Sequence, residues 1–401
     1  MRELIFNQNP WWEGKRDYQI EKWEGMKIRW TPKWIEKLCV KPFSLNFVVG
    51  PRQTGKTTGI KLLIQELLKK VKPESVFYFD CTLLADLESF KKILDEYLRI
   101  KETEKVKTSY IFLDEVTALD EWWRIVKGYI DMGVFRNDVI TVSGSSSLRL
   151  KRVAELFPGR RGMGKEVLVL PLSFKQFLEI KGVQFKASGK IEKDMEVLRR
   201  NESRIRKIFE TYLKVGGFPL SINQDPTAQV QLISSFESEL LRAGKSLELS
   251  KAILASIIRK APSPLSFSTI GSDVGVSYKT AQEYVETFQN LFVLGIALFK
   301  ERTIKWRKER KFFLLDPFLA RTLSLWVDEK FLESAFYEWI VQADLQRKFG
   351  SVYYVRNKFE IDCIANDLKI EVKIGKPHRK YPKNVFLVDS ENLPFFLAAL
   401  G

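Results

Sequence analysis

The stretch Gly50-Pro51-Arg52-Gln53-Thr54-Gly55-Lys56-Thr57 fits the pattern G-x-x-x-x-G-K-[ST] at every fixed position. It lies between an apolar run at 43–49 and a segment at 59–71 whose apolar residues recur at helical spacing. A strand, a loop and a helix in this order are the context in which the pattern forms a phosphate-binding loop. Its backbone N–H groups can surround phosphate oxygens, and the helix N-terminus adds positive potential.

Two side chains of this loop carry most of its expected chemistry. Lys56 can reach the β- and γ-phosphates of a nucleotide, and the Thr57 hydroxyl can bind Mg²⁺. The sequence therefore predicts ATP and Mg²⁺ as cofactors. The expected nucleotide-binding residues are Gly50, Pro51, Arg52, Gln53, Thr54, Gly55, Lys56, Thr57 and Thr58.

An acidic pair is the expected partner of the loop. Asp114 and Glu115 follow the apolar run 110–113, which predicts two carboxylates at the end of a buried strand. We expect Asp114 to hold Mg²⁺ through water and Glu115 to polarise the attacking water as a general base. A second carboxylate has no necessary role in binding, so the pair favours hydrolysis of the nucleotide over binding alone.

Two further segments offer groups that could contact the nucleotide. The run 139–142 predicts a strand ending in hydroxyls, where Ser143 or Ser145 could contact the γ-phosphate or the attacking water. Arg160 and Arg161 lie in a Gly-containing loop and could act as fingers on a transition-state phosphate. An ordinary serine-rich turn and a solvated loop are the open alternatives for these two segments.

A helix-turn-helix is predicted downstream. A short capped helix at 266–275 is followed by a turn and by a second helix whose first turn contains Tyr278, Lys279 and Gln282, groups suited to phosphates and base edges. The loop 300–311 holds seven basic and two acidic residues, which is typical of a wing that binds a DNA backbone. Winged helices also serve as protein–protein modules and as lids on ATPase cores, and both alternatives stay open.

Two carboxylates and a lysine are expected to meet near the C-terminus. Residues 360–373 predict a β-hairpin in which Glu371 and Lys373 share a face, while Asp362 can point to the same place. Carboxylates bind Mg²⁺, and the lysine can orient or activate water for attack on a phosphodiester. Glu338, on a preceding amphipathic helix, could complete the site. A solvated hairpin with charged edges is the alternative.

The order of phosphate loop, acidic strand and hydroxyl-ended strand resembles that of the AAA-like ATPases. The chain is similar, over nearly its whole length, to the prokaryotic and largely archaeal ATPases that carry a C-terminal restriction-endonuclease-like domain of uncharacterised function. The looser motifs that narrow this resemblance are Ser143-Gly144-Ser145-Ser146, Pro158-Gly159-Arg160, Leu170-Pro171-Leu172-Ser173-Phe174 and Gly216-Gly217-Phe218-Pro219.

The C-terminal constellation resembles the PD-(D/E)XK nuclease fold. In this resemblance Asp362 is the acid of the PD pair, Glu371 and Lys373 are the E-x-K, and Glu338 is the acid of the first helix. The resemblance implies Asp362 and Glu371 as Mg²⁺ ligands. The sequence departs from the pattern at Ile361, which stands where the family has proline.

The fold class expected from these segments is α/β, with a parallel P-loop sheet, a helical lid and winged helix, and a small restriction-endonuclease-like α/β domain. The expected regions are a Trp-rich N-terminal arm at 1–41, the P-loop ATPase domain at 42–180, a helical lid or linker at 181–260, a winged helix at 261–328 and a nuclease-like domain at 329–401.

The composition limits the partners. Sixty-six Lys and Arg against fifty Asp and Glu give a net charge of +16, which favours a polyanionic partner; the candidate wing and the tail 373–383 are its expected locations. Three scattered cysteines predict no disulfide framework or cysteine zinc site, and the single histidine, His378, excludes a His-pair metal site. The sequence shows no signal peptide or transmembrane run, so we expect a cytoplasmic protein without a membrane partner.

The function expected from the sequence is a Mg²⁺-dependent ATPase coupled to DNA binding or processing. The alternative is an ATP-controlled signalling switch that uses an inactive nuclease-like domain as an interaction platform. A kinase-like transferase is a distant third, because no second substrate pocket is recognisable. A homo-oligomer stays open, since an arginine finger could come from a second copy.

Overall fold

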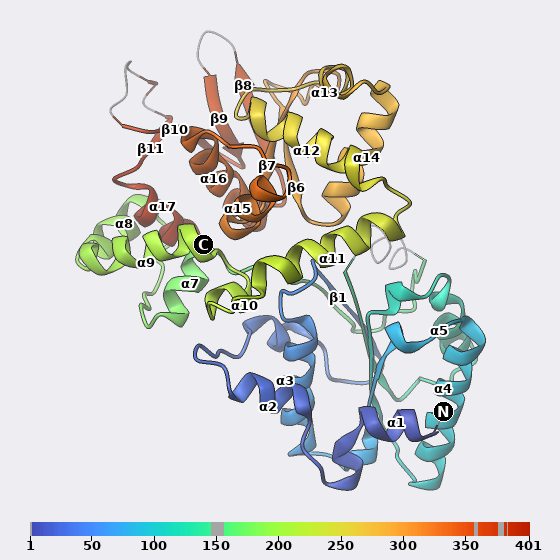
Figure 1. The fold of residues 1–401 in the computed structure, drawn as a ribbon. Coiled ribbons are helices and arrows are strands. Elements are labelled where there is room, and N and C mark those ends of the chain that lie inside the picture. Colours follow the sequence, from blue (N-terminus) through green and yellow to red (C-terminus); the bar gives the residue numbers. More distant parts are fainter. Residues whose placement is uncertain (1, 146–155, 357–359, 376–380, 383) are drawn as a thin grey trace. The chain divides into compact units, whose positions relative to one another are not determined.

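The computed structural model describes residues 2–145, 156–356, 360–375, 381–382 and 384–401. The chain divides into two compact units, Met1–Leu170 and Pro171–Gly401 (Figure 1). The division lies at Pro171, whereas the sequence analysis expected the first boundary after the arm at residue 41 and the second at residue 180. The Trp-rich arm is therefore part of the first unit, and each unit is described by itself below.

A parallel five-stranded sheet forms the centre of the first unit. Its strand order is β2-β3-β4-β1-β5, and every neighbouring pair is parallel. The four longer strands are almost continuously buried, as expected where helices cover both faces. This confirms the expected α/β fold with a parallel sheet. The strands are β1 Ser44–Val49, β2 Val76–Asp80, β3 Tyr110–Asp114, β4 Val139–Gly144 and β5 Glu166–Leu168.

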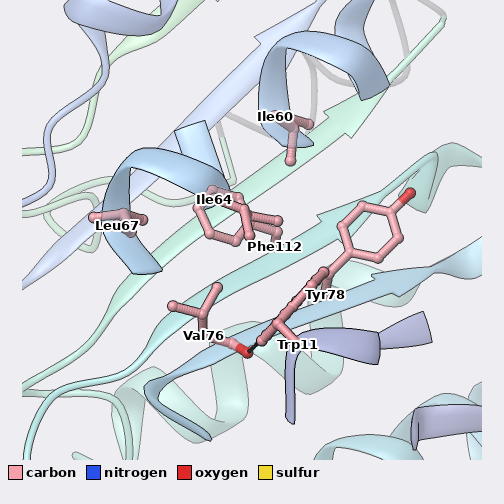
Figure 2. Close-up of a cluster of buried hydrophobic side chains, with 7 residues drawn as sticks. All are labelled: Trp11, Ile60, Ile64, Leu67, Val76, Tyr78 and Phe112. Carbon is pink, nitrogen blue, oxygen red and sulfur yellow. Dashed lines mark hydrogen bonds between the residues drawn. The ribbon is translucent and has the colours of Figure 1, made fainter. Parts of the chain in front are cut away.

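Side-chain alternation along the strands directs two helices to opposite faces of this sheet (Figure 1). Val76, Tyr78 and Phe112 pack against α3 (Lys56–Leu68), as Figure 2 shows. Phe77 points the other way and stacks on Tyr97 of α4 (Leu87–Thr103), with ring centroids 4.2 Å apart. Helix α5 (Trp122–Asp131) contacts α4.

The N-terminal arm packs on strand β2. It consists of α1 (Arg2–Gln8), a 3-10 turn at Pro10–Glu13, α2 (Tyr18–Glu24) and a 3-10 turn at Lys33–Lys37. The indole N–H groups of Trp11 and Trp12 both donate to the Val76 carbonyl, at 3.0 Å each, and the first of these bonds is drawn in Figure 2. Trp11 and Trp12 therefore anchor the arm on this strand.

Side chains of the arm also close the edge of the sheet at β2. The Asn9 amide donates to the Tyr78 carbonyl at 2.9 Å and accepts from the Tyr78 N–H at 2.7 Å. Oε1 of the Gln8 side chain accepts from the Asp80 N–H at 2.7 Å. These bonds replace those that a further strand would make, so the edge is not left open for pairing with another chain.

The second unit combines helices with a mixed six-stranded sheet of order β11-β10-β9-β8-β6-β7 (Figure 1). Its helices are α7 Phe174–Ile180, α8 Ile191–Arg199, α9 Glu202–Val215, α10 Pro219–Ile222, α11 Ala228–Arg242, α12 Leu247–Lys260, α13 Phe267–Val274, α14 Tyr278–Asn290, α15 Pro317–Trp326, α16 Glu333–Phe349 and α17 Leu393–Leu400. Its strands are β6 Leu294–Phe299, β7 Arg310–Leu314, β8 Val352–Arg356, β9 Glu360–Ala365, β10 Leu368–Lys373 and β11 Phe386–Asp389.

Helices α13 and α14 form where the sequence predicts a helix-turn-helix. The Ser266 hydroxyl caps α13 by accepting from the Thr269 N–H at 2.9 Å, and Gly275 ends this helix with φ of 73°. Ser277 caps α14 in the same way, through the Thr280 N–H at 3.1 Å. Strands β6 and β7 follow as an antiparallel pair, as the predicted wing requires.

One sheet runs through the boundary expected between residues 328 and 329. Strand β6, assigned to the winged helix, pairs in parallel with β8 of the C-terminal region. Helix α16 contacts strands from both regions, namely β6 and β7 as well as β8, β9 and β10. The apolar β6 thus has a partner on each side, and the two expected regions share one core. Among the helices that the structure describes, none is long and apolar enough to span a bilayer.

Candidate functional site

The loop Gly50–Thr57 connects β1 to α3, as the pattern predicts. A Cβ atom on Gly50 would lie 1.9 Å from the Val169 carbonyl oxygen, so no side chain fits there. Gly55 precedes the helix with φ of 83°, a left-handed conformation that favours glycine. The Thr54 hydroxyl donates to the Pro51 carbonyl at 2.9 Å and closes the turn. The remaining predicted residues, Arg52, Gln53 and Thr58, lie in this loop or in the first turn of α3.

The Lys56 ammonium lies inside this loop. Its side chain is 4% exposed, and Nζ donates to the carbonyls of Gly50 at 2.9 Å and Pro51 at 3.0 Å. Nζ also lies 3.5 Å from Oε1 of Glu115. The predicted phosphate-binding cation and the predicted general base are therefore neighbours.

The Asp114 carboxylate collects hydroxyl groups from three other elements. Oδ2 accepts from the Thr57 hydroxyl at 2.6 Å and from the Tyr78 hydroxyl at 2.9 Å. Oδ1 accepts from the Ser143 hydroxyl. The strand order explains the contact between Ser143 and Asp114. Because β4 lies between β1 and β3, the end of β4 places Ser143 between the phosphate loop that follows β1 and the acidic pair that follows β3. The structure thus brings together Thr57, Asp114 and Ser143 of the predicted site.

Glu115 is held by its backbone, and one of its carboxylate oxygens has no partner among the described residues. Its N–H donates to Oγ of Ser143 at 3.1 Å and to Oδ1 of Asp114 at 3.2 Å. Its φ of 48° is uncommon for a residue with a side chain, and such backbone often occurs at functional sites. Among the described residues, nothing donates to its buried Oε2. An acceptor with an open lone pair in this position suits a water molecule.

Tyr78 is a site residue that the sequence analysis missed. Burial, followed by the charge of Asp114, raises the pKa of Tyr78 well above its ordinary value, so the phenol keeps the proton it donates. The buried Lys61 ammonium lies 3.3 Å from the centroid of the Tyr78 ring and 2.9 Å from Oδ2 of Asp17 in the arm. Two features of the sequence could have pointed to this pair. One is the single tyrosine in the apolar strand Val76–Asp80, and the other is a lysine, Lys61, among the apolar residues of α3.

Arg160 is not brought to the phosphate loop. Its guanidinium pairs with Asp131 of α5 at 2.5 Å and donates to the Pro158 carbonyl at 3.2 Å. Arg161 lies over the Phe47 ring and 3.5 Å from Glu166. Neither arginine contacts a residue of the loop in these pairs, so the structure gives no support to an arginine finger from this segment.

The side chains at Thr57 and Asp114 fit a Mg²⁺ ion that is held together with nucleotide phosphates. They offer a hydroxyl and a carboxylate whose oxygens are 2.6 Å apart, and Mg²⁺ takes one or two protein oxygens of this kind with phosphates and water. In the parts of the chain that the structure describes, no group of three or more His, Cys, Asp or Glu could hold a metal ion by itself.

The C-terminal residues predicted from the hairpin also lie close together. Asp362 of β9 accepts from the Val372 N–H through Oδ2 at 3.0 Å. Glu371 of β10 accepts from the Lys373 ammonium at 2.7 Å and from the Tyr381 hydroxyl at 2.9 Å, both through Oε1. The predicted His378 of the basic tail lies outside the described residues, as do Lys376, Arg379, Lys380 and Lys383.

A second lysine, Lys311, completes this cluster and was placed elsewhere by the sequence analysis. It was expected in the solvated wing, but β7 begins at Arg310 and the Lys311 side chain is buried. Its Nζ lies 2.8 Å from Asp362, 3.0 Å from Glu338 and 3.1 Å from Glu360, in each case measured to a carboxylate oxygen. We call these four residues the Lys311 cluster. The only sequence signal was the apolar run that follows Lys311 directly.

One ammonium does not balance three carboxylates, and the pKa values reflect this. Burial and then the charge of Asp362 raise the pKa of Glu338 to about 8, although Lys311 opposes the shift. Burial lowers the pKa of Lys311, but the charges of Glu338 and Asp362 outweigh burial and hold it well above its ordinary value. Burial and Asp362 also raise the pKa of Glu371, against the effect of Lys373.

Stability as a function of pH tests the buried Glu338. With a pKa of about 8 in the folded chain and an ordinary value of 4.5, the folded chain keeps a proton that the unfolded chain has released. Stability should therefore fall as the pH rises from about 5 to about 8. Glu338→Gln should flatten this fall, because an amide does not titrate.

The urea midpoint of the full chain at several pH values in this window measures the effect. Glu333→Gln is the matched control, since Glu333 is exposed in the first turn of the same helix. An unchanged pH slope in Glu338→Gln would contradict the assignment of the proton to Glu338.

Comparison with known proteins finds two domain models along the chain. Residues 43–178 match the AAA domain, and residues 206–330 match a domain of unknown function. An uncharacterized protein of Haemophilus influenzae is 24% identical over 300 residues, covering 69% of this chain and 68% of that protein. An uncharacterized protein of Methanocaldococcus jannaschii is 24% identical over 348 residues, covering 80% and 72%.

Solved structures with similar parts include two archaeal proteins. The ORC2 protein of Aeropyrum pernix, in its ADPNP–ADP complexes, is 10% identical with a TM-score of 0.38, covering 71% of this chain and 88% of that chain. CDC6P of Pyrobaculum aerophilum is 13% identical with a TM-score of 0.28, covering 81% and 94%. The domain match and the parallel sheet with its phosphate loop together show an AAA-type, ATPase-like fold in the first unit.

Proposed function

We propose that this protein is a Mg²⁺-dependent ATPase whose nucleotide cycle acts on bound DNA. The observation that carries the ATPase part is the meeting of Lys56, Asp114 and Glu115 at the end of the sheet, where Oε2 of Glu115 has no partner among the residues that the structure describes. A loop that only binds nucleotide has no need for a second, backbone-held carboxylate beside its lysine.

The residues divide the work of hydrolysis among them. The backbone of the loop and Lys56 bind the phosphates, while Thr57 and Asp114 would hold Mg²⁺, which neutralises phosphate charge when bound. Glu115 orients the attacking water through Oε2 and takes its proton. Tyr78 and Ser143 keep the Asp114 carboxylate in one orientation, because each donates a hydroxyl hydrogen to it.

DNA binding is supported by the surface of the predicted winged helix. Trp306 is 65% exposed at the centre of the loop between β6 and β7, and Tyr278 at the start of α14 is 51% exposed. Exposed aromatic rings among cations suit stacking on bases and contacts to phosphates. The exposed basic residues around Trp306 are Arg302, Lys305, Arg307 and Lys308.

The signalling-switch alternative is favoured by one observation. It requires a nuclease-like module that binds a partner without cutting, and the Lys311 cluster already contains a cation of the chain itself. The Lys311 cluster lies in the sheet of the second unit, so it does not bear on the proposal that the first unit hydrolyses ATP.

Substitution of Lys56 tests the ATPase. Lys56→Ala should lower ATP turnover by about 100-fold or more, because a preorganised donor to the developing phosphate charge is lost. The measurement is phosphate release at saturating MgATP, with circular dichroism to check folding. Lys69→Ala, an exposed lysine just past the end of α3, is the control. Turnover equal to that of the wild type would refute the proposal.

Removal of the four basic residues of the candidate wing tests DNA binding. Replacing Arg302, Lys305, Arg307 and Lys308 by alanine should weaken binding and lower the slope of log affinity against log salt by up to about 4. A fluorescence titration with double- and single-stranded DNA at several salt concentrations measures both. The matched control removes four exposed basic residues in and around α8, namely Lys186, Lys190, Lys193 and Arg200. An equal loss in both variants would mean that general basicity, and not the wing, binds DNA.

A further inference from the structure

We propose that Lys311 is the resident cation of the Glu338, Glu360 and Asp362 cluster, and that it excludes the divalent metal ion implied there by the nuclease resemblance. The chain would then carry a nuclease-like module that recognises a partner without metal-dependent cleavage. The proposal concerns the second unit and does not depend on ATP hydrolysis in the first.

The geometry around Lys311 is that of a filled cation site. The residue is 2% exposed, and its three contacts come from two elements: Glu338 from α16, and Glu360 and Asp362 from β9. An ammonium has three N–H donors and no acceptor. Nζ donates to Asp362 at 2.8 Å and to Glu338 at 3.0 Å, and it lies 3.1 Å from the Glu360 carboxylate.

A divalent cation does not fit beside this ammonium. Mg²⁺ binds oxygens at about 2.1 Å and needs lone pairs, which an ammonium cannot provide. An ion on the Asp362 and Glu338 oxygens would lie within a few ångströms of Nζ, in a buried place where like charges repel strongly. Metal uptake would require the Lys311 side chain to leave.

Two of these carboxylates make further contacts within the chain, although Oε2 of Glu371 has no hydrogen-bond partner among the described residues. Oδ2 of Asp362 accepts from the Val372 N–H, and Oε1 of Glu338 accepts from the Gln342 amide at 2.8 Å. Glu371 is paired with Lys373. Both carboxylates that the resemblance assigns to Mg²⁺ thus have a lysine of this chain at hydrogen-bond distance. The chain therefore has acidic residues and a lysine at the positions that the nuclease resemblance implies. It does not have a site there that can accept a metal ion.

Binding of Mn²⁺ to the nucleotide-free full chain tests the proposal. Equilibrium dialysis, or the electron paramagnetic resonance signal of unbound Mn²⁺, counts the bound ions. Wild type and Asp362→Asn should bind the same amount, because Asp362 holds no metal while Lys311 is present. Lys311→Met removes the ammonium at similar length and should gain about one Mn²⁺ per chain.

Two further variants locate the gained ion. It should be lost in the double variant Lys311→Met with Asp362→Asn, and it should be absent from Lys308→Met, which removes an exposed lysine of the preceding loop. If Lys311→Met does not fold, Lys311→Gln takes its place. If neither variant folds, the comparison of Mn²⁺ binding by the wild type and by Asp362→Asn still tests the proposal.

Two results would overturn the proposal. One is Mn²⁺ binding by the wild type that Asp362→Asn abolishes, since the cluster would then accept a metal beside Lys311. The other is a folded Lys311 variant that gains no ion, since Lys311 would then not be what keeps a metal out.

Discussion

The carboxylate of Asp114 is the contact on which the first unit depends. Its two oxygens accept hydroxyl hydrogens from the phosphate loop, from β2 and from β4, so three elements distant in sequence share one acceptor. Through Tyr78 the same carboxylate is linked to the N-terminal arm, whose Asn9 bonds the backbone of that tyrosine. The arm thus supports the candidate site while it closes the edge of the sheet.

The candidate nucleotide site could be predicted because its parts are short and local. The loop pattern fixes Gly50, Gly55 and Lys56 within eight residues, and Asp114 and Glu115 stand directly after an apolar strand. The helix caps at Ser266 and Ser277 are equally local. In each case the residues that make the structure are neighbours in sequence, so one window contains the whole signal.

Contacts between distant segments could not be predicted in this way. Tyr78 reaches Asp114 only because β2 and β3 are neighbours in register, and the pairing of β6 with β8 joins two regions that composition separates. Lys311 is the second residue of β7, and neighbouring residues of a strand point to opposite faces of the sheet. An error of one position in the predicted strand would therefore exchange buried and exposed side chains. The apolar run after Lys311 is a sequence signal of its burial, but it does not show which carboxylates Lys311 meets. The Lys56 site is local in sequence and the Lys311 cluster is not, so the two sites differ in predictability for a topological reason.

Turnover and nucleotide binding by Glu115→Gln test most directly whether the end of this sheet hydrolyses ATP. The substitution keeps the shape of the side chain and removes its charge and its capacity to accept a proton. The account predicts that MgATP binding stays within about threefold of the wild type while turnover falls by about 100-fold or more. Turnover at the wild-type rate, with binding intact, would contradict the assignment of Glu115 as the general base.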